Sequence, residues 1–185
     1  MRFEYLLDDE VTQELDAKLR ALLSTCFTKE QDKIFQTQRY FNEIPRHRYL
    51  IWDGDKLAAH VAVHEKQVMI DDQSFPISGI AEVCVDPGSR GLGLVKILLE
   101  AVHQDALERG DAFSVLFGRT PVYRSSGYTP INNLKIKVAP NHWVSTDDTM
   151  VCSLKIICTA TDGSFSRLSF LNGFSPRLTL CENTQ

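Results

Sequence analysis

Residues 83–94 read VCVDPGSRGLGL, a run in which a short apolar stretch meets a proline turn, an arginine and two glycines. The apolar stretch predicts the end of a buried strand. From Leu94 apolar residues recur at helical spacing as far as Ala106, and Gly110 predicts the end of that helix. The glycines let the backbone approach a ligand closely. Because a helix start offers unpaired N–H groups and a positive dipole end, the segment predicts an anion site suited to a pyrophosphate.

Two other phosphate-binding loops do not fit these residues. A P-loop needs Gly-Lys-Ser/Thr after the turn, whereas this chain has Gly93, Leu94 and Val95 there. A dinucleotide fingerprint needs a third glycine near the position that Lys96 occupies. The anion site must therefore be of another kind.

Periodicity on both sides of this segment predicts strands interleaved with helices. The expected helices are residues 11–27, 29–42, 94–109 and 120–127, the first with leucines at 15, 19, 22 and 23 on one face. The expected strands are residues 2–7, 49–52, 57–70, 77–85, 112–117, 131–138 and 150–157. The tail, residues 158–185, shows no clean period and is assigned no element. This order predicts an α+β fold, a mixed sheet covered by helices.

Composition predicts an ordinary globular protein. The 185 residues suit one domain, residues 1–185, and no apolar run approaches the ~20 residues that cross a bilayer. The net charge is −4 and no Lys/Arg block exists, which argues against nucleic acid as a partner. The five cysteines form no Cys-x-x-Cys pair, so neither a disulfide framework nor a zinc knuckle is expected. We expect a cytoplasmic protein without a membrane partner. The sequence leaves open whether the protein forms a homodimer.

The pattern Arg90-x-x-Gly93 after a strand resembles the acetyl-CoA loop of the GNAT acyltransferase superfamily. That family has Arg/Gln-x-x-Gly-x-Gly/Ala, so Val95 departs at the last position. The resemblance implies a mostly antiparallel central sheet flanked by helices, acetyl-CoA as co-substrate, and loop amides that hold its pyrophosphate. The implied cofactor-binding residues are Val83, Cys84, Val85, Arg90, Gly91, Leu92, Gly93, Leu94 and Val95.

A second segment carries the same resemblance. Residues 120–128, TPVYRSSGY, look like the family's Tyr-x-x-x-Gly-Phe/Tyr segment. In relatives the first tyrosine lies near the cofactor sulfur and acts as general acid, which implies that role for Tyr123. The alternative is an aromatic residue that packs a short helix onto the sheet, and it fits Tyr128 better.

Residues 50–52 (LIW), 57–63 (LAAHVAV), the loop and residues 147–151 (DDTMV) resemble the aminoglycoside 2′-N-acetyltransferases in order and spacing, a resemblance that covers roughly residues 49–157. The similarity implies transfer of an acetyl group to the amine of a small molecule, an aminoglycoside-like acceptor included, by direct attack. A protein N-acetyltransferase is the alternative within the enzyme class. A non-catalytic acyl-CoA sensor is the alternative outside it, and a sensor would not need Tyr123 or an acidic base.

Glu82 is the candidate general base, because the attacking amine must lose a proton. A gapless alignment with the aminoglycoside enzymes, however, sets their glutamate opposite Ala81, and a slip of one residue changes the face of a strand. A β-bulge would restore the face; without one, Glu82 is a carboxylate on the sheet surface. A bulge would also free N–H groups of Val83, Cys84 and Val85 for the developing oxyanion.

Other polar residues have mainly structural interpretations. His60 and His64 stand roughly 13 Å apart on a strand, too far for one metal ion, so no metal site is expected. His60 either lines the acceptor cleft or is a satisfied histidine of the sheet. Cys84 fits a buried thiol better than a nucleophile. Asp147 and Asp148 either attract a cationic acceptor or form a solvated turn.

Overall fold

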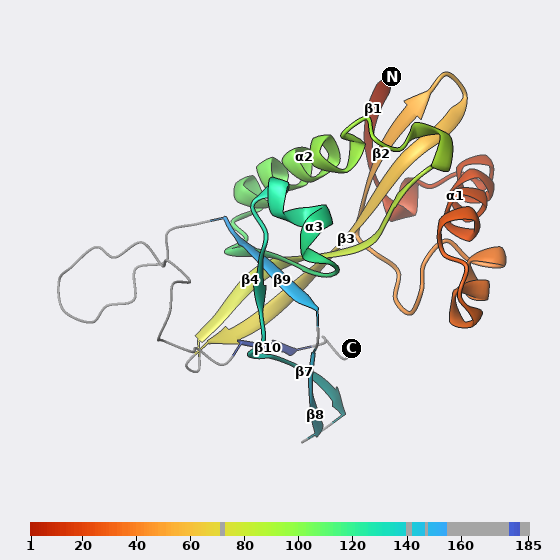
Figure 1. The fold of residues 1–185 in the computed structure, drawn as a ribbon. Coiled ribbons are helices and arrows are strands. Elements are labelled where there is room, and N and C mark those ends of the chain that lie inside the picture. Colours follow the sequence, from red (N-terminus) through yellow and green to blue (C-terminus); the bar gives the residue numbers. More distant parts are fainter. Residues whose placement is uncertain (71–72, 140–141, 147, 155–177, 182–185) are drawn as a thin grey trace. The chain divides into compact units, whose positions relative to one another are not determined.

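The computed structural model describes residues 1–70, 73–139, 142–146, 148–154 and 178–181. Its internal contacts divide the chain into two units, Met1–Glu65 with Gly79–Gln104, and Lys66–Ser78 with Asp105–Gln185. Figure 1 labels the helices and strands and colours the chain along its sequence. The helices are α1 (Gln13–Cys26), α2 (Leu94–Arg109) and α3 (Thr120–Tyr123). The strands are β1 (Arg2–Leu7), β2 (His47–Asp53), β3 (Lys56–Ile70), β4 (Gln73–Val85), β5 (Phe113–Phe117), β6 (Thr129–Ile131), β7 (Leu134–Ala139), β8 (His142–Ser145), β9 (Thr149–Ser153) and β10 (Leu178–Cys181).

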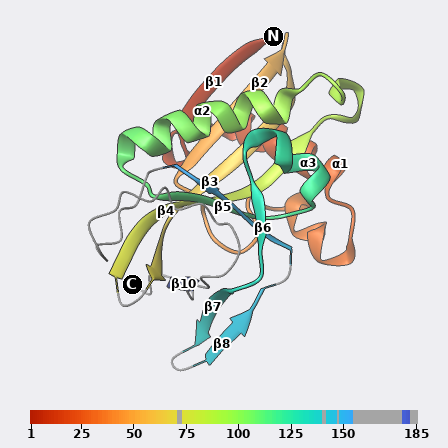
Figure 2. The ribbon, with the colours of Figure 1, turned by 60° about the vertical axis from the view of Figure 1, so that its left-hand side comes forward.

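The sheet of the first unit runs β1–β2–β3–β4. β1 pairs antiparallel with β2, from Arg2 opposite Trp52 to Leu7 opposite His47, and β2 pairs antiparallel with β3. Helix α1 lies on one face of these strands, and the first turns of α2 lie on the other (Figure 2).

Helix α1 confirms the helix expected from the leucine spacing. Thr12 caps it, because its hydroxyl accepts a hydrogen bond from the Leu15 amide at 3.2 Å. Leu19 and Leu23 are fully buried, and such a side chain contributes about 2–5 kcal/mol when compared with alanine. The core of this unit comprises Leu6, Leu15, Leu19, Leu22, Leu23, Phe35, Leu50, Trp52, Leu57 and Cys84.

The helix expected at residues 29–42 is wrong in length and type. The structure has a 3₁₀ helix over Glu30–Gln36, and the chain then bends toward β2. A helix continued to residue 42 would use the Phe41 amide and the Arg39 carbonyl in its own hydrogen bonds. Here the Phe41 amide donates to Glu82 at 2.9 Å, and the Arg39 carbonyl accepts from Arg48 at 2.9 Å. These contacts across the unit replace the helical bonds.

The second unit continues the sheet in the order β6–β9–β5–β4–β3–β10–β7–β8. β3 with β10, β5 with β9, β6 with β9 and β7 with β8 are antiparallel pairs, and β10 with β7 is parallel, so the mostly antiparallel mixed sheet is confirmed. Its core comprises Val68, Ile77, Ala112, Phe113, Val115, Leu134 and Val151.

Three sequence expectations in this unit need correction. The strand expected at 131–138 is two strands, β6 and β7, separated at residues 132–133. β8 was not expected, because all four of its side chains are exposed and show no apolar alternation. β10 lies in the tail that received no element, and residues 155–157 of the expected last strand lie outside the described residues. No helix in the described ranges combines the length and the apolar character that crossing a membrane requires.

Candidate active site

The segment from β4 to α2 forms the expected strand, turn and helix. Asp86 fixes the turn, because its carboxylate accepts the Gly88 amide at 2.9 Å and the Lys56 ammonium at 2.7 Å. Gly91 and Gly93 have φ of +80° and +73°, a region that residues with a side chain avoid. A Cβ at either glycine would meet no atom of the protein within 4 Å. The backbone here is therefore shaped for close approach, and the space beside it is open.

Helix α2 begins directly after these glycines. At the start of this helix, the Ile97 amide donates a hydrogen bond to the Gly93 carbonyl at 3.2 Å. The amides of residues 94–96 precede that bond and have no carbonyl partner within the helix, by the geometry of any α-helix. Arg90, in the loop before α2, is exposed, whereas Leu94 is buried. A ligand phosphate would thus meet backbone N–H groups, the positive end of the helix dipole and one guanidinium group.

Glu82 lies three residues before the end of β4 and has a φ of +54°, which is rare outside glycine. From the sequence, Glu82 is expected to face inward only if the strand is irregular at this point, and the positive φ is such an irregularity. Its side chain is only 5% exposed. The alternative of a carboxylate on the sheet surface is therefore wrong.

The Glu82 carboxylate has two polar partners. One oxygen accepts the Phe41 amide at 2.9 Å, and the other lies 3.4 Å from the Arg48 guanidinium. Burial raises the pKa of Glu82 to about 7, although Arg48 and the Phe41 amide oppose that rise. A carboxylate with this pKa exchanges a proton near neutral pH, as a general base must.

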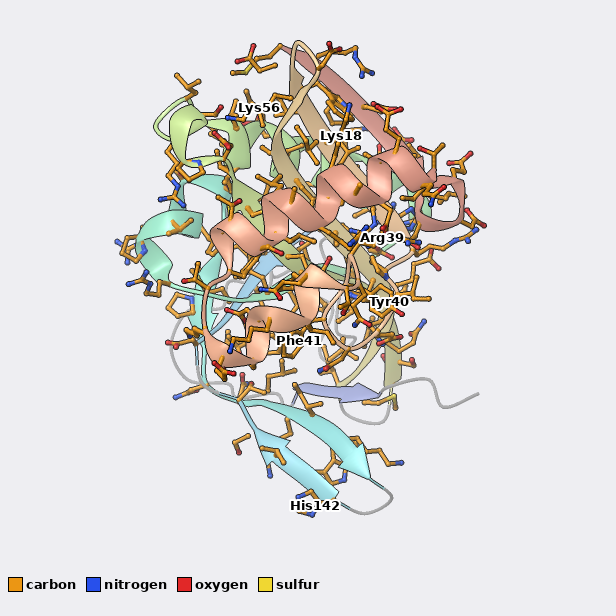
Figure 3. The ribbon with its side chains drawn as sticks, turned by 90° about the vertical axis from the view of Figure 1, so that its right-hand side faces the viewer. Lys18, Arg39, Tyr40, Phe41, Lys56 and His142 are labelled. Atoms are coloured by element: carbon orange, nitrogen blue, oxygen red, sulfur yellow. The ribbon has the colours of Figure 1, made fainter. Side chains whose placement is uncertain are left out.

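A buried ion network stands behind Glu82. Arg48 is fully buried and donates to Asp8 at 2.6 Å, and Arg39 binds the same carboxylate. Figure 3 labels Arg39 and Phe41 in the segment between the 3₁₀ helix and β2. Burial raises the pKa of Asp8, but the hydrogen bonds from Arg39 and Arg48 outweigh it and hold the pKa below its usual value. Asp8 thus stays charged and offsets part of the charge of Arg48.

His60 is a satisfied histidine of the sheet. It is fully buried, and its two ring nitrogens lie 3.0 Å from Arg48 Nη1 and 3.2 Å from the Glu82 carbonyl oxygen. Burial, together with the charge of Arg48, lowers its pKa well below the usual value. His60 is therefore a neutral residue behind Glu82. Across the described residues, no three His, Cys, Asp or Glu side chains gather closely enough to hold a metal ion.

Two thiols lie beside the end of β4. The Cys26 thiol donates to the Val85 carbonyl at 3.3 Å, and a hydrogen bond with Cys84 and the Arg90 guanidinium lower its pKa to about 7. Cys84 is buried, and burial raises its pKa well above the usual value. Cys84 is thus the buried thiol that the sequence favoured over a nucleophile.

Tyr123 and Tyr128 lie in the second unit. Tyr123 is half-buried at the end of α3, and its ring meets Tyr128 edge-on with centroids 6.1 Å apart. Tyr128 is 1% exposed and its hydroxyl is 2.5 Å from that of Ser114, so it has the packing role expected of it. A Cβ at Gly118 would collide with the Tyr123 ring. The bare backbone of Gly118 is therefore the surface against which that ring packs.

Asp148 is exposed, and its φ is +55°. Its carbonyl accepts the Gly118 amide at 2.8 Å, so it forms the exposed turn before β9 that the sequence offered as one interpretation. Asp147 lies outside the described residues.

A hollow of about 480 Å³ lies in the first unit, next to the ion network. Asp8 and Arg39 belong both to its wall and to the network, whereas Glu82 does not line it. Four carboxylates and two guanidinium groups face the hollow. The lining residues are Asp8, Asp9, Arg39, Glu43, Ile44, Pro45, Arg46, His64 and Glu65.

Sequence reasoning missed Arg48, Asp8, Arg39 and the Phe41 amide. One signal was available, because Arg48 stands in the strand-forming run HRYLIW next to apolar residues. An arginine at such a position is buried only with partners, so it indicates a buried network without naming its members.

Comparison with known proteins gives the family. The model of the acetyltransferase (GNAT) domain matches residues 10–131. The chain belongs to the GNAT acetyltransferase family. A search of curated proteins gives no significant match.

Solved structures confirm the GNAT fold. The GNAT family N-acetyltransferase YhbS from Escherichia coli, solved in complex with CoA, has a TM-score of 0.62 at 21% identity over 84% of this chain and 83% of that one. A GNAT acetyltransferase from Brucella melitensis in complex with acetyl-CoA has a TM-score of 0.52 at 16% identity over 70% and 84%.

A third relative is much longer than this chain. A GCN5-related N-acetyltransferase from Anabaena variabilis has a TM-score of 0.54 at 26% identity over 69% of this chain. The match covers 32% of that protein, so this chain spans about a third of its length.

Proposed function

We propose that the protein transfers an acetyl group from acetyl-CoA to the amine of a small molecule by direct attack. The observation that carries this proposal is Glu82, a buried carboxylate with a pKa of about 7 on an irregular turn of β4. It lies on the strand that leads into the loop of Gly91 and Gly93. Acetyl transfer to an amine needs a proton acceptor and a site for the cofactor diphosphate, and this segment offers a candidate for each.

In the proposed reaction the loop amides between Arg90 and Val95 hold the diphosphate of the cofactor. Val83, Cys84 and Val85 present backbone N–H groups near the thioester oxygen, where negative charge develops during attack. Glu82 takes the proton of the ammonium group, whose usual pKa of about 10 keeps it unreactive at neutral pH. The neutral amine then attacks the thioester carbon, so that a C–N bond forms and the C–S bond breaks. Tyr123 gives a proton to the leaving thiolate, and the second proton lost by the attacking nitrogen returns to the tyrosinate through water.

The hollow beside the network supports a small acceptor with several positive charges. Its volume falls within the roughly 300–1,000 Å³ of small-molecule sites. Its carboxylates outnumber its guanidinium groups, which favours a cation. Part of an aminoglycoside or a shorter polyamine fits this description. We propose that the hollow holds the unreactive part of the acceptor while one amine reaches Glu82.

An amine panel tests the function. Calorimetry with CoA and acetyl-CoA measures cofactor binding, and release of the CoA thiol measures transfer to polyamines, aminoglycosides and peptides with free amines. Transfer to polyamines or aminoglycosides is the expected result. Turnover on peptides alone favours a protein N-acetyltransferase. Cofactor binding without turnover on any amine favours a sensor, and no binding at millimolar cofactor rejects the proposal.

Replacing Tyr123 by Phe should lower kcat roughly tenfold and leave the CoA dissociation constant within about twofold. The loss is smaller than for a typical general acid, because a thiolate, with a pKa near 8.5, is already a good leaving group. Steady-state kinetics and calorimetry measure the two effects. Tyr128→Phe is the matched control, since it loses the hydroxyl contact with Ser114 and should lower stability rather than kcat. Equal losses in kcat and CoA binding for Tyr123→Phe would reject the acid role.

Replacing Gly118 by Ala should lower kcat severalfold, because the added Cβ displaces the Tyr123 ring. If the loss acts through the Tyr123 hydroxyl, Gly118→Ala should add little in a Tyr123→Phe background. The four proteins of this cycle are compared by kcat at saturating acetyl-CoA. Fully additive losses would show that Gly118 acts by another route.

A further inference from the structure

Arg48 contacts Glu82 and three of the polar groups near it. Its guanidinium donates to Asp8 at 2.6 Å, to His60 Nε2 at 3.0 Å and to the Arg39 carbonyl at 2.9 Å, and it lies 3.4 Å from the Glu82 carboxylate. The side chain is completely buried. A buried arginine with this many partners has one orientation available, so it holds each of them in place.

The partners of His60 fix the position of its proton. A guanidinium group can only donate, so the Nε2 that faces Arg48 is an acceptor. A carbonyl oxygen can only accept, so Nδ1 carries the hydrogen and donates to the Glu82 carbonyl at 3.2 Å. His60 is thus a neutral bridge from Arg48 to the main chain of Glu82.

Glu82 is consequently held at both ends. Its φ of +54° turns its peptide away from regular strand geometry, and His60 gives the carbonyl a hydrogen-bond donor in that orientation. Arg48 and the Phe41 amide hold the carboxylate. A positive φ at a residue other than glycine costs of order 1–3 kcal/mol and persists only where the surroundings impose it. The contacts of His60, Arg48 and the Phe41 amide with Glu82 impose the positive φ here.

We propose that Arg48 and His60 are positioning residues for acetyl transfer, which together keep the irregular turn at Glu82 and aim its carboxylate toward the acceptor amine. This inference rests on the proposed function of Glu82 as the base. Neither residue touches a reacting atom; both act through Glu82.

The charges around Glu82 give this role a distinct signature. The groups near Glu82 come from several elements. The charged ones are Arg48 on β2 and Asp8 in the turn after β1. The others are neutral His60 on β3, the Phe41 amide in the bend before β2, and the Cys84 thiol on β4. Burial and the charge of Asp8 raise the pKa of Glu82, whereas Arg48 lowers it. Removal of Arg48 should therefore raise that pKa further, and the base should become protonated at pH values where it is normally ionised.

The first test replaces Arg48 by Met and follows Glu82 directly. Carbon-13 NMR of the glutamate carboxyl groups, with Glu82→Gln to assign the signal, reports the titration midpoint without any substrate. We expect the midpoint to rise from near 7 by about one pH unit. If Arg48→Met fails to fold, Arg48→Lys replaces it in this test. Lysine keeps the charge but cannot reach all four partners, so the midpoint should rise by less. Arg2→Met is the control, since Arg2 pairs with Glu4 at 3.0 Å and does not bind Glu82.

The second test compares the kcat and the CoA affinity of His60→Leu with those of His60→Asn. Asparagine keeps an N–H near the position of Nδ1, so it should retain most of kcat, whereas leucine should lose roughly tenfold with unchanged CoA affinity. The pH profile of kcat should shift upward with the NMR midpoint in Arg48→Met. An unmoved Glu82 midpoint in the Arg48 variants, or His60→Asn no better than His60→Leu, overturns the positioning role. Absence of turnover in the unmodified protein rejects the proposed function alone, because the NMR titration still decides the role of Arg48.

Discussion

Glu82→Gln should lower kcat at pH 7.5 by roughly 10²–10⁴-fold, the usual contribution of general acid–base catalysis. Glutamine keeps the shape and the oxygen that accepts the Phe41 amide, but it cannot take a proton. CoA affinity by calorimetry should stay within about twofold, because Glu82 lies before the loop that holds the diphosphate. Glu14→Gln is the matched control, an exposed glutamate of α1 paired with Lys18. A variant with more than about a tenth of normal kcat would exclude Glu82 as the base.

The same substitution should change how stability depends on pH. The folded protein keeps the Glu82 proton up to about pH 7, whereas the unfolded chain releases it near the ordinary value of 4.5. Between these values the folded state binds more protons, so this group makes the free energy of unfolding fall as pH rises. Glutamine does not titrate, so Glu82→Gln removes this contribution to the fall in the free energy of unfolding. Its stability relative to the unmodified protein should therefore grow from pH 5 to pH 8 in urea unfolding, and parallel curves would contradict the raised pKa.

Gly93→Ala should raise the CoA dissociation constant roughly 10–100-fold, equivalent to about 1.4–2.8 kcal/mol. At a φ of +73° alanine is strained by about 1 kcal/mol or more. Its methyl group would meet no atom of the protein within 4 Å, so it projects into the open space beside the loop. A diphosphate in that space would meet the methyl group and shift away from the amides. Isothermal calorimetry with CoA measures the loss.

Gly54→Ala is a control that separates strain from ligand contact. Gly54 has a φ of +58° at the turn between β2 and β3, and a Cβ there also meets nothing within 4 Å. Both variants should lose similar stability in thermal unfolding. Only Gly93→Ala should lose CoA affinity. Normal CoA binding by Gly93→Ala would place the cofactor elsewhere.

The elements that the sequence predicts are those whose pattern is set within a few residues. Helix α1 follows from leucines at helical spacing, and the loop before α2 follows from two glycines between an apolar run and an apolar stripe. Both were confirmed as structure because the local pattern and the final packing agree. The strand β4 begins at Gln73 rather than at residue 77, and it contains Pro76, a residue that is uncommon within strands.

The candidate site was predictable only where it is continuous in sequence. The loop residues and Glu82 come from one segment, but the partners of Glu82 come from residues 41, 48 and 60, and Arg48 is in turn bound by residues 8 and 39. Which of these meet depends on the register of β2 against β3 and on the bend after residue 36. Two of the contacts use main-chain groups of Arg39 and Phe41, which no pattern of side chains reveals. The same two contacts explain why the helix expected at residues 29–42 does not form.

The last described strand has a consequence for how this protein can be handled. β10 binds β3 on one side, with Thr179 opposite Met69, and β7 on the other, with Thr179 opposite Lys135. A shortened chain that ended before Leu178 would leave two rows of main-chain donors and acceptors without a neighbour at once. Such open rows recruit strands from other molecules and lead to aggregation. Shortening from the carboxyl end should accordingly stop after Cys181.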